Sequence, residues 1–191
     1  MNKTFRLVFI GLLVAQSLTL YLFEGMFPVP FLTPGAKLGL ANLITVIALY
    51  LLPSTKDVFL ILLLRVLLST FFGGGPAVFI YSAAGAAMSF TCMVLLKKVG
   101  KNNVSIIGVS AAGAIFHHIG QLIAAACILQ NAALMLYLPV LSLTGTITGI
   151  LIGIAAHFIV HRLASLHFFT ANLTSPSAPN NKISPQKSKA L

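Results

Sequence analysis

The feature that most constrains this chain is a series of long apolar runs with almost no charge inside them. A bilayer core about 30 Å thick needs roughly 20 apolar residues of helix to cross it. Charged residues make up 7% of the chain, against about a quarter in a typical soluble domain. The sequence therefore predicts an all-α integral membrane bundle of six transmembrane helices. The six runs are Leu7–Phe23, Leu38–Leu52, Val58–Phe72, Val78–Leu96, Val104–Ile128 and Leu136–Val160.

Two details of this count need separate argument. The second and third runs are short and are joined by the polar turn LPSTKD, so a helical hairpin that does not cross fully is the alternative there. Lys3 and Arg6 precede the first run, as in a signal peptide. The run continues unbroken to Phe23, longer than the usual apolar core of a signal peptide, and we expect it to be a retained first helix.

The distribution of charge predicts the orientation in the membrane. The net charge is +10, with Glu24 and Asp57 as the acidic residues. With six spans, Lys37 is the one cation on the outer side, and the other cations share the opposite side. Cytoplasmic loops carry the excess of Lys and Arg, so both termini are expected in the cytoplasm and the protein in the cytoplasmic (inner) membrane. Because the cations lie between apolar runs, without an aromatic-rich basic groove, nucleic acid is not an expected partner.

The chain divides into two regions by composition. Residues 1–169 form the predicted transmembrane domain, and residues 170–191 form a basic tail rich in Ser, Pro and Asn. Such a tail is expected to be disordered in the cytoplasm, with a weak attraction to anionic membrane lipid. Cys92 and Cys127 lie within apolar runs without a CxxC motif, so we expect buried free thiols and no metal site.

The stretch PFLTPGAKLGLAN interrupts the apolar pattern between the first two runs. Its prolines and Gly35 predict an irregular outer segment over residues 24–37, and such backbone is tolerated at membrane depth only against protein or a water-filled cavity. A helix beginning near Gly35 would offer its amides, with Lys37, to an anion. The alternative is an interfacial lysine in a plain loop.

Arg65 lies in the middle of the third run, where a charge is costly and is by default a functional candidate. Neither acidic residue is expected near the membrane centre. The guanidinium therefore either meets backbone carbonyls and polar side chains, or binds an anion that the protein does not supply.

The fifth run contains FHHIGQ, in which Gln121 can share a helix face with either histidine. The histidines are about 100° apart around the axis, so we expect one to line a cavity and the other to pack. We place His118 in the cavity. A proton relay stays open, and a metal site is not expected because no thiol or carboxylate ligand lies at a recognisable spacing.

These polar groups are expected to converge on one cavity in the outer half of the membrane. It suits an anionic or strongly polar small molecule. The candidate substrate-binding residues are Arg65, Lys37, Asn42, Tyr81, Ser82, His118 and Gln121.

Small residues recur at a spacing of four and predict close helix packing. We expect Gly145, Gly149 and Gly153 of the last helix to pack inside the bundle. Gly11 and Ala15 of the first helix are the candidates for docking a partner membrane protein.

The motifs PGAKLGLAN, LLRVLLSTFFGG, YSAAGAAMS, HHIGQ and YLPVLSLTGTITGILIG occur in this order over residues 5–160. Together they resemble the Gx transporter family, many of whose members are labelled heptaprenyl diphosphate synthase component I. The family is similar to the substrate-binding S components of energy-coupling-factor transporters. The resemblance implies a six-helix protein that captures a small molecule from outside. It also implies docking on a coupling transmembrane subunit, often through small residues of the first helix, and the use of separate ATPases.

Two function classes follow, and neither makes this chain an enzyme. Prenyl transfer needs magnesium held by clustered carboxylates, and Glu24 and Asp57 are expected on opposite membrane faces without a DDxxD motif. There is also no P-loop motif for ATP hydrolysis. We expect a transporter substrate-binding subunit without a cofactor. The alternative is a non-catalytic membrane subunit associated with polyprenyl (heptaprenyl) diphosphate or quinone synthesis.

Overall fold

A computed structural model describes residues 3–26, 39–73, 75–100 and 103–165. Every regular element in these ranges is helical, which confirms the all-α fold class. The helices are α1 (Lys3–Gly25), α2 (Asn42–Leu51), α3 (Thr55–Gly73), α4 (Gly75–Gly100), α5 (Ile106–Leu129), the short 3₁₀ helix η1 (Ala132–Tyr137) and α6 (Leu138–Ala164). The predicted tail and most of the predicted irregular segment, with Lys37, lie outside the described residues.

Four segments in the described part of the chain are long and apolar enough to cross a membrane. They are Thr4–Gly25, Phe79–Gly100, Ile106–Leu129 and Ala132–Ala164. The last combines η1 and α6, and Pro139 in the first turn of α6 marks where the α-helix begins. The expectation of six spans is thus confirmed for four segments by length and composition.

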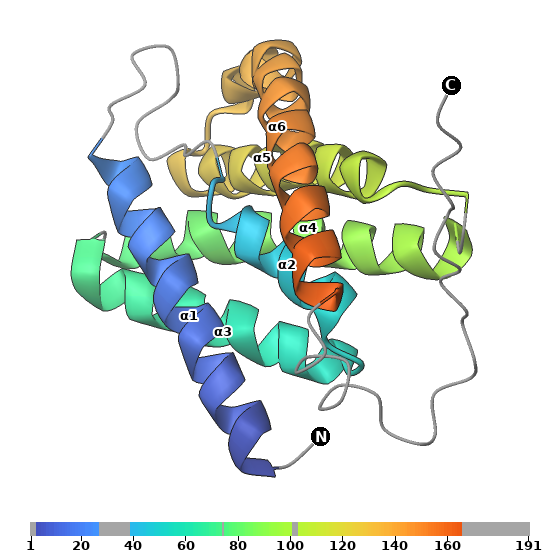
Figure 1. The fold of residues 1–191 in the computed structure, drawn as a ribbon. Helices are drawn as coiled ribbons and strands as arrows, with labels where there is room; N and C mark the ends of the chain where they lie inside the picture. The colour runs from blue at the N-terminus through green and yellow to red at the C-terminus, as the bar shows by residue number, and fades with distance from the viewer. Residues whose placement is uncertain (1–2, 27–38, 74, 101–102, 166–191) are drawn as a thin grey trace.

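α2 and α3 depart from the expected spans for different reasons. α2 has 10 residues, 8 of them buried, and is therefore about 15 Å long, half of a bilayer core. Figure 1 shows it at the centre of the bundle, so its apolar sequence reflects the protein core. α3 has 19 residues but carries three charges, at Lys56, Asp57 and Arg65. For α2, the alternative prediction of a helical hairpin that does not fully cross the membrane therefore fits better than the prediction of a complete span.

Contacts between helix ends show that α1 to α4 alternate in direction, as the sequence predicted. Arg6 near the start of α1 forms a two-point ion pair with Asp57 at the start of α3, with Nε donating to Oδ2 at 2.8 Å. Lys97 near the end of α4 donates to the Leu49 carbonyl near the end of α2. These four residues therefore lie at one end of the bundle.

α4, α5 and α6 pack against one another through glycines, and Figure 1 shows α4 and α5 side by side. A Cβ on Gly149 of α6 would lie 2.7 Å from the Ala111 Cα, and one on Gly153 would lie 2.7 Å from the Ile107 Cα. Backbones this close leave no room for a side chain. The prediction that the glycines of the last helix pack inside the bundle is confirmed.

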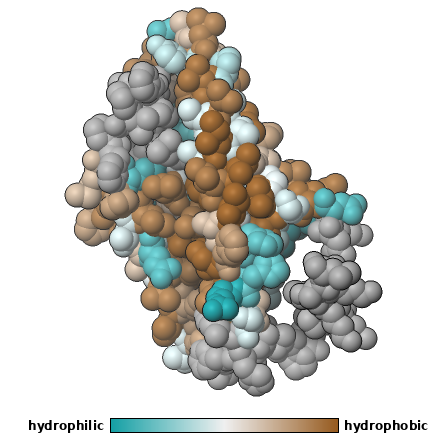
Figure 2. Space-filling view, turned by 45° about the horizontal axis from the view of Figure 1, so that its top comes forward, coloured by the Kyte–Doolittle hydropathy of each residue, from teal (hydrophilic) through white to brown (hydrophobic). Residues whose placement is uncertain are grey.

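The outer surface of the bundle is as apolar as its core. Large apolar side chains are strongly exposed on several helices, among them Leu7, Phe71, Leu143 and Phe158. Figure 2 shows apolar residues over much of one face. A monomeric soluble protein rarely exposes so much contiguous apolar surface. The several apolar helices with exposed apolar faces agree with a multi-pass membrane protein.

Candidate functional site

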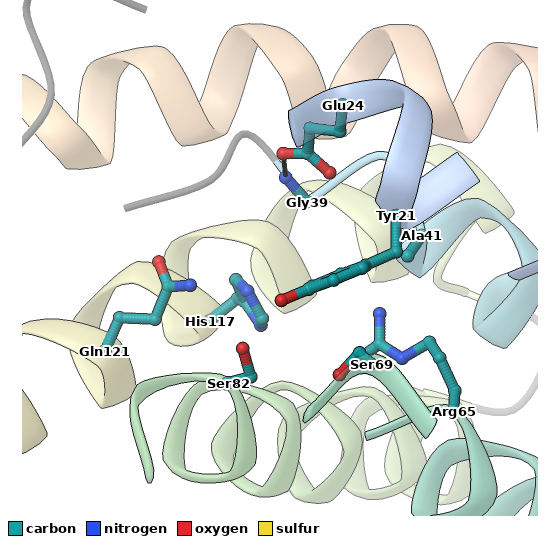
Figure 3. Close-up of a pocket in the computed structure, with 9 residues that line it drawn as sticks. All are labelled: Tyr21, Glu24, Gly39, Ala41, Arg65, Ser69, Ser82, His117 and Gln121. Carbon is teal, nitrogen blue, oxygen red and sulfur yellow. Dashed lines mark hydrogen bonds between the residues drawn. The ribbon is translucent and has the colours of Figure 1, made fainter. Parts of the chain in front are cut away.

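A small polar cavity lies where the end of α1, the start of α2, the second half of α3, the first turns of α4 and the middle of α5 meet (Figure 3). We call it the Arg65 cavity. Its volume of about 10 Å³ accommodates about one water molecule. Its lining residues are Tyr21, Glu24, Gly39, Ala41, Arg65, Ser69, Ser82, His117 and Gln121.

Three helices each present a pair of polar side chains one turn apart to this cavity. Residues spaced by three or four positions share a helix face. The pairs are Tyr21 and Glu24 on α1, Arg65 and Ser69 on α3, and His117 and Gln121 on α5. The cavity is therefore built from regular helix faces, which hold its polar groups in fixed directions.

Glu24 fixes the approach of the chain to α2. Its two carboxylate oxygens accept bonds from the amides of Gly39, at 2.5 Å, and Leu40, at 3.0 Å. Gly39 has a φ of +86°, a left-handed conformation that favours glycine. α2 begins at Asn42 rather than near Gly35. The amides just before α2 are thus bonded to a carboxylate of the protein, whereas the amides near Gly35 lie outside the described residues.

Arg65 is 4% exposed, and Glu24 is 5% exposed on the same cavity. The Glu24 carboxylate attracts the guanidinium. The sequence predicts no acidic residue near the membrane centre, whereas the structure places Glu24 on the same cavity as Arg65. α1 packs against α3, so the last turn of α1 brings Glu24 to the cavity that Arg65 lines.

Four buried polar atoms at or beside the cavity have no hydrogen-bond partner among the described residues. They are Arg65 Nε, His117 Nδ1, Gln121 Oε1 and Asn42 Oδ1. Their side chains are at most 5% exposed. A buried polar group without a partner is costly, so such groups are normally bonded to protein, water or a ligand. The set offers donors and acceptors to a bound molecule.

The two histidines of α5 divide as the sequence predicted, but with their roles exchanged. His117 lines the cavity, whereas His118 is fully buried against α6. A Cβ on Gly145 would lie 2.6 Å from His118 Cδ2, so the glycine makes the space that His118 fills. The sequence could not show which histidine faces the cavity, because this depends on where α6 packs against α5.

The remaining sequence candidates fall into three groups. Ser82 and Gln121 line the cavity with Arg65. Asn42 is buried beside Gly39, its Nδ2 3.1 Å from where a Gly39 Cβ would lie, but it is not on the cavity wall. Tyr81 is half-buried and does not line the cavity.

Sequence reasoning missed Tyr21, Glu24 and Ser69. A signal for them was present, since Glu24 is one of two acidic residues and Tyr21 precedes it by three positions. Ser69 follows Arg65 by one helical turn. Applying the same-face argument used for His118 and Gln121 to these helices would have found all three.

Gly11 and Ala15 are exposed on α1, and a Cβ on Gly11 would meet no heavy atom within 4 Å. Beside them lies a largely apolar groove of about 350 Å³, lined by Leu12, Ala15, Gln16, Thr19, Leu20 and Ile44. This face is accessible to a partner helix, as the docking prediction requires.

The described residues hold no group of three His, Cys, Asp or Glu side chains suited to a metal ion. Cys92 is half-buried, whereas Cys127 is exposed. The expectation of two buried thiols is therefore wrong for Cys127, because that part of α5 faces outward rather than into the bundle.

The sequence model of one protein family matches residues 13–159, and the family is described as heptaprenyl diphosphate synthase component I. No curated protein and no solved structure matches the chain. The matched range begins within α1 and ends within α6, so it includes every residue of the Arg65 cavity.

Proposed function

Since the chain belongs to the heptaprenyl diphosphate synthase component I family, we propose that it is a non-catalytic membrane subunit that binds a small polar molecule in the Arg65 cavity. In this proposal the chain is the substrate-binding subunit of a transporter and captures its ligand from outside. A coupling transmembrane subunit and separate ATPases would supply the energy. The Gly11 face of α1 is the proposed contact with the coupling subunit.

The observation that carries the proposal is the unpartnered Nε of Arg65, buried in a cavity with unpartnered atoms of His117 and Gln121. A charged group in the membrane that served packing alone would be expected to have its hydrogen bonds satisfied by protein. Here buried polar side chains line one small space, and atoms of three of them lack protein partners among the described residues. A binding site for a polar molecule accounts for this arrangement.

The location of the cavity supports capture from outside. Its residues lie at the end of the bundle away from the Arg6–Asp57 ion pair and the Lys97 contact with α2. Under the positive-inside rule the end that carries more cations is cytoplasmic. The cavity would then open toward the outer side of the membrane.

The placement of the acidic side chains supports a non-catalytic role. Glu24 is bonded to the amides of Gly39 and Leu40, and Asp57 to Arg6 at the other end of the bundle. Magnesium-dependent diphosphate chemistry uses carboxylates that converge on one ion. Each carboxylate is instead bound to protein donors in a different place.

A second candidate function follows from the family description and from a groove between α4 and α5. The groove is strongly apolar, has a volume of about 580 Å³ and is lined by Ala87, Met88, Thr91, Cys92, Leu95, Leu96, Ala112 and Phe116. It approaches the end of α4 that carries Lys97 and Lys98. An isoprenoid chain would fit the apolar surface, with its diphosphate near the lysines, as in a membrane subunit that presents lipid substrate to a prenyl synthase.

The two candidates are separated by purification of the protein from its own membrane under mild conditions. The transporter proposal predicts an ATPase-containing complex and a small polar molecule that is lost in the Arg65→Ala variant. The second candidate predicts a soluble prenyl synthase subunit and an isoprenoid that Arg65→Ala retains. Size-exclusion chromatography confirms that the variant is folded, and Ser82→Ala, a milder change on the same cavity, replaces it if it is not. If the small molecule remains after both changes, the proposed site is misplaced.

A further inference from the structure

The Arg65 cavity contains one positive and one negative side chain, and both are more than nine-tenths buried. Arg65 is 4% exposed and Glu24 is 5% exposed. Among the other lining residues that the structure describes, none carries a formal charge when histidine is counted as neutral. The described lining of the cavity therefore has a formal charge of zero.

The unpartnered atoms define what a bound molecule must offer. Arg65 Nε is a donor and needs an acceptor, whereas the Gln121 side-chain amide on the same cavity has both a donor and an acceptor group. His117 Nδ1 can take either role, depending on its tautomer. The Ser82 hydroxyl on the same wall both donates and accepts. A molecule that satisfies this set carries donors and acceptors together.

We infer that the molecule bound in the Arg65 cavity is a small neutral or zwitterionic compound with both hydrogen-bond donors and acceptors, and that it is not a phosphate or diphosphate. This inference rests on the proposed function and narrows its ligand class. A zwitterion would place its anionic group at Arg65 and its cationic group toward Glu24, whose oxygens can each accept more than one bond.

A diphosphate is excluded by the balance of charge. It carries about two to three negative charges at neutral pH, and burying a charge is costly unless it is paired. One guanidinium cannot neutralise it, and the Glu24 carboxylate on the same cavity would repel it. A prenyl diphosphate bound by this protein would therefore lie elsewhere, such as in the groove between α4 and α5.

The packing indicates which wall moves to admit such a molecule. The cavity has room for about one water molecule, so anything larger requires one wall to shift. The α4–α5 wall has no spare space, since a Cβ on Gly85 would lie 2.9 Å from the His117 carbonyl oxygen and one on Gly120 would lie 2.6 Å from the Ala84 carbonyl oxygen. The opposite wall includes Glu24, which accepts hydrogen bonds from the backbone amides of Gly39 and Leu40. Opening is therefore expected at the end of α1.

The test measures binding of inorganic diphosphate to the full-length protein by isothermal titration calorimetry in detergent. Glu24→Gln removes the negative charge from the cavity, and Asp57→Asn is the matched control that removes a carboxylate charge at the other end of the bundle. Glu24→Gln should bind diphosphate at least about tenfold more tightly than wild type, the change produced by about 1.4 kcal/mol of repulsion. Asp57→Asn should bind like wild type.

A second measurement applies whether or not Glu24→Gln folds. The molecule released from wild-type protein, purified from its own membrane, is identified by accurate mass and should contain no phosphorus. A phosphorus-containing molecule, or Arg65-dependent binding of diphosphate that is equally tight in wild type and Glu24→Gln, overturns the ligand class while leaving the binding function intact. A released molecule that Arg65→Ala retains refutes the proposed function itself.

Discussion

Replacing Gly85 with alanine tests whether the α4–α5 wall positions the residues of the Arg65 cavity. A Cβ at this position would lie 2.8 Å from the Gln121 side chain and 2.9 Å from the His117 carbonyl oxygen. Ordinary contact begins at 3.4 Å, so the backbone contact alone requires the two helices to separate by about 0.5 Å. The residues that must yield are the two that α5 contributes to the cavity.

The magnitude follows by comparison with a glycine that has free space. Overpacking of a well-packed interface typically costs about 1–3 kcal/mol. Replacing glycine with alanine in a helix also gains up to about 1 kcal/mol from the lower backbone entropy of the unfolded chain. In Gly11→Ala the new Cβ meets no heavy atom within 4 Å. This variant should therefore gain the entropic stabilisation without the cost of overpacking. The difference between the two variants thus isolates the overpacking at Gly85.

The assay is thermal unfolding of both variants in the same detergent, followed by size-exclusion chromatography. About 1–3 kcal/mol corresponds to about 2–12 °C in a chain of this length. Gly85→Ala should melt lower than Gly11→Ala by this amount and should retain less of the copurified molecule. Equal melting temperatures with equal retention would refute the close packing of α4 on α5 and, with it, the rigid wall of the cavity.

Further predictions concern the topology and the local stability. With Cys92 and Cys127 replaced by Ser, single cysteines introduced at Lys37 and Lys98 should react with a membrane-impermeant thiol reagent from opposite sides of the membrane; labelling from the same side contradicts the topology. Ser105 caps α5, since its Oγ accepts a bond from the Gly108 amide at 3.1 Å, and Ser105→Ala should lower stability by about 1 kcal/mol. A melting temperature unchanged by that substitution would show that the cap contributes nothing in detergent.

Much of the fold could be predicted because apolar runs and their breaks are local features. All six predicted runs begin within four residues of the corresponding α-helix, and the last of them begins within η1. The prediction was wrong for α2, because its apolar run predicted a membrane span but the helix is short and buried in the core. An apolar run in a membrane protein can face lipid or the interior, and the sequence alone does not separate the two when every residue is apolar.

The candidate site was predicted in part. Arg65, Ser82 and Gln121 were placed together correctly, because an isolated charge and its polar neighbours are visible in an apolar sequence. The position of Glu24 was not, because it depends on how the end of α1 packs against α3. The choice between His117 and His118 depends likewise on which face of α5 the glycines of α6 cover. Both are properties of the assembled bundle.

The central claim is tested most directly by a crystal structure of the wild-type protein purified from its own membrane. The account predicts electron density larger than one water molecule in the Arg65 cavity, within hydrogen-bond distance of Arg65 Nε and Gln121 Oε1. A single ordered water that satisfies both atoms in an otherwise closed cavity would contradict it.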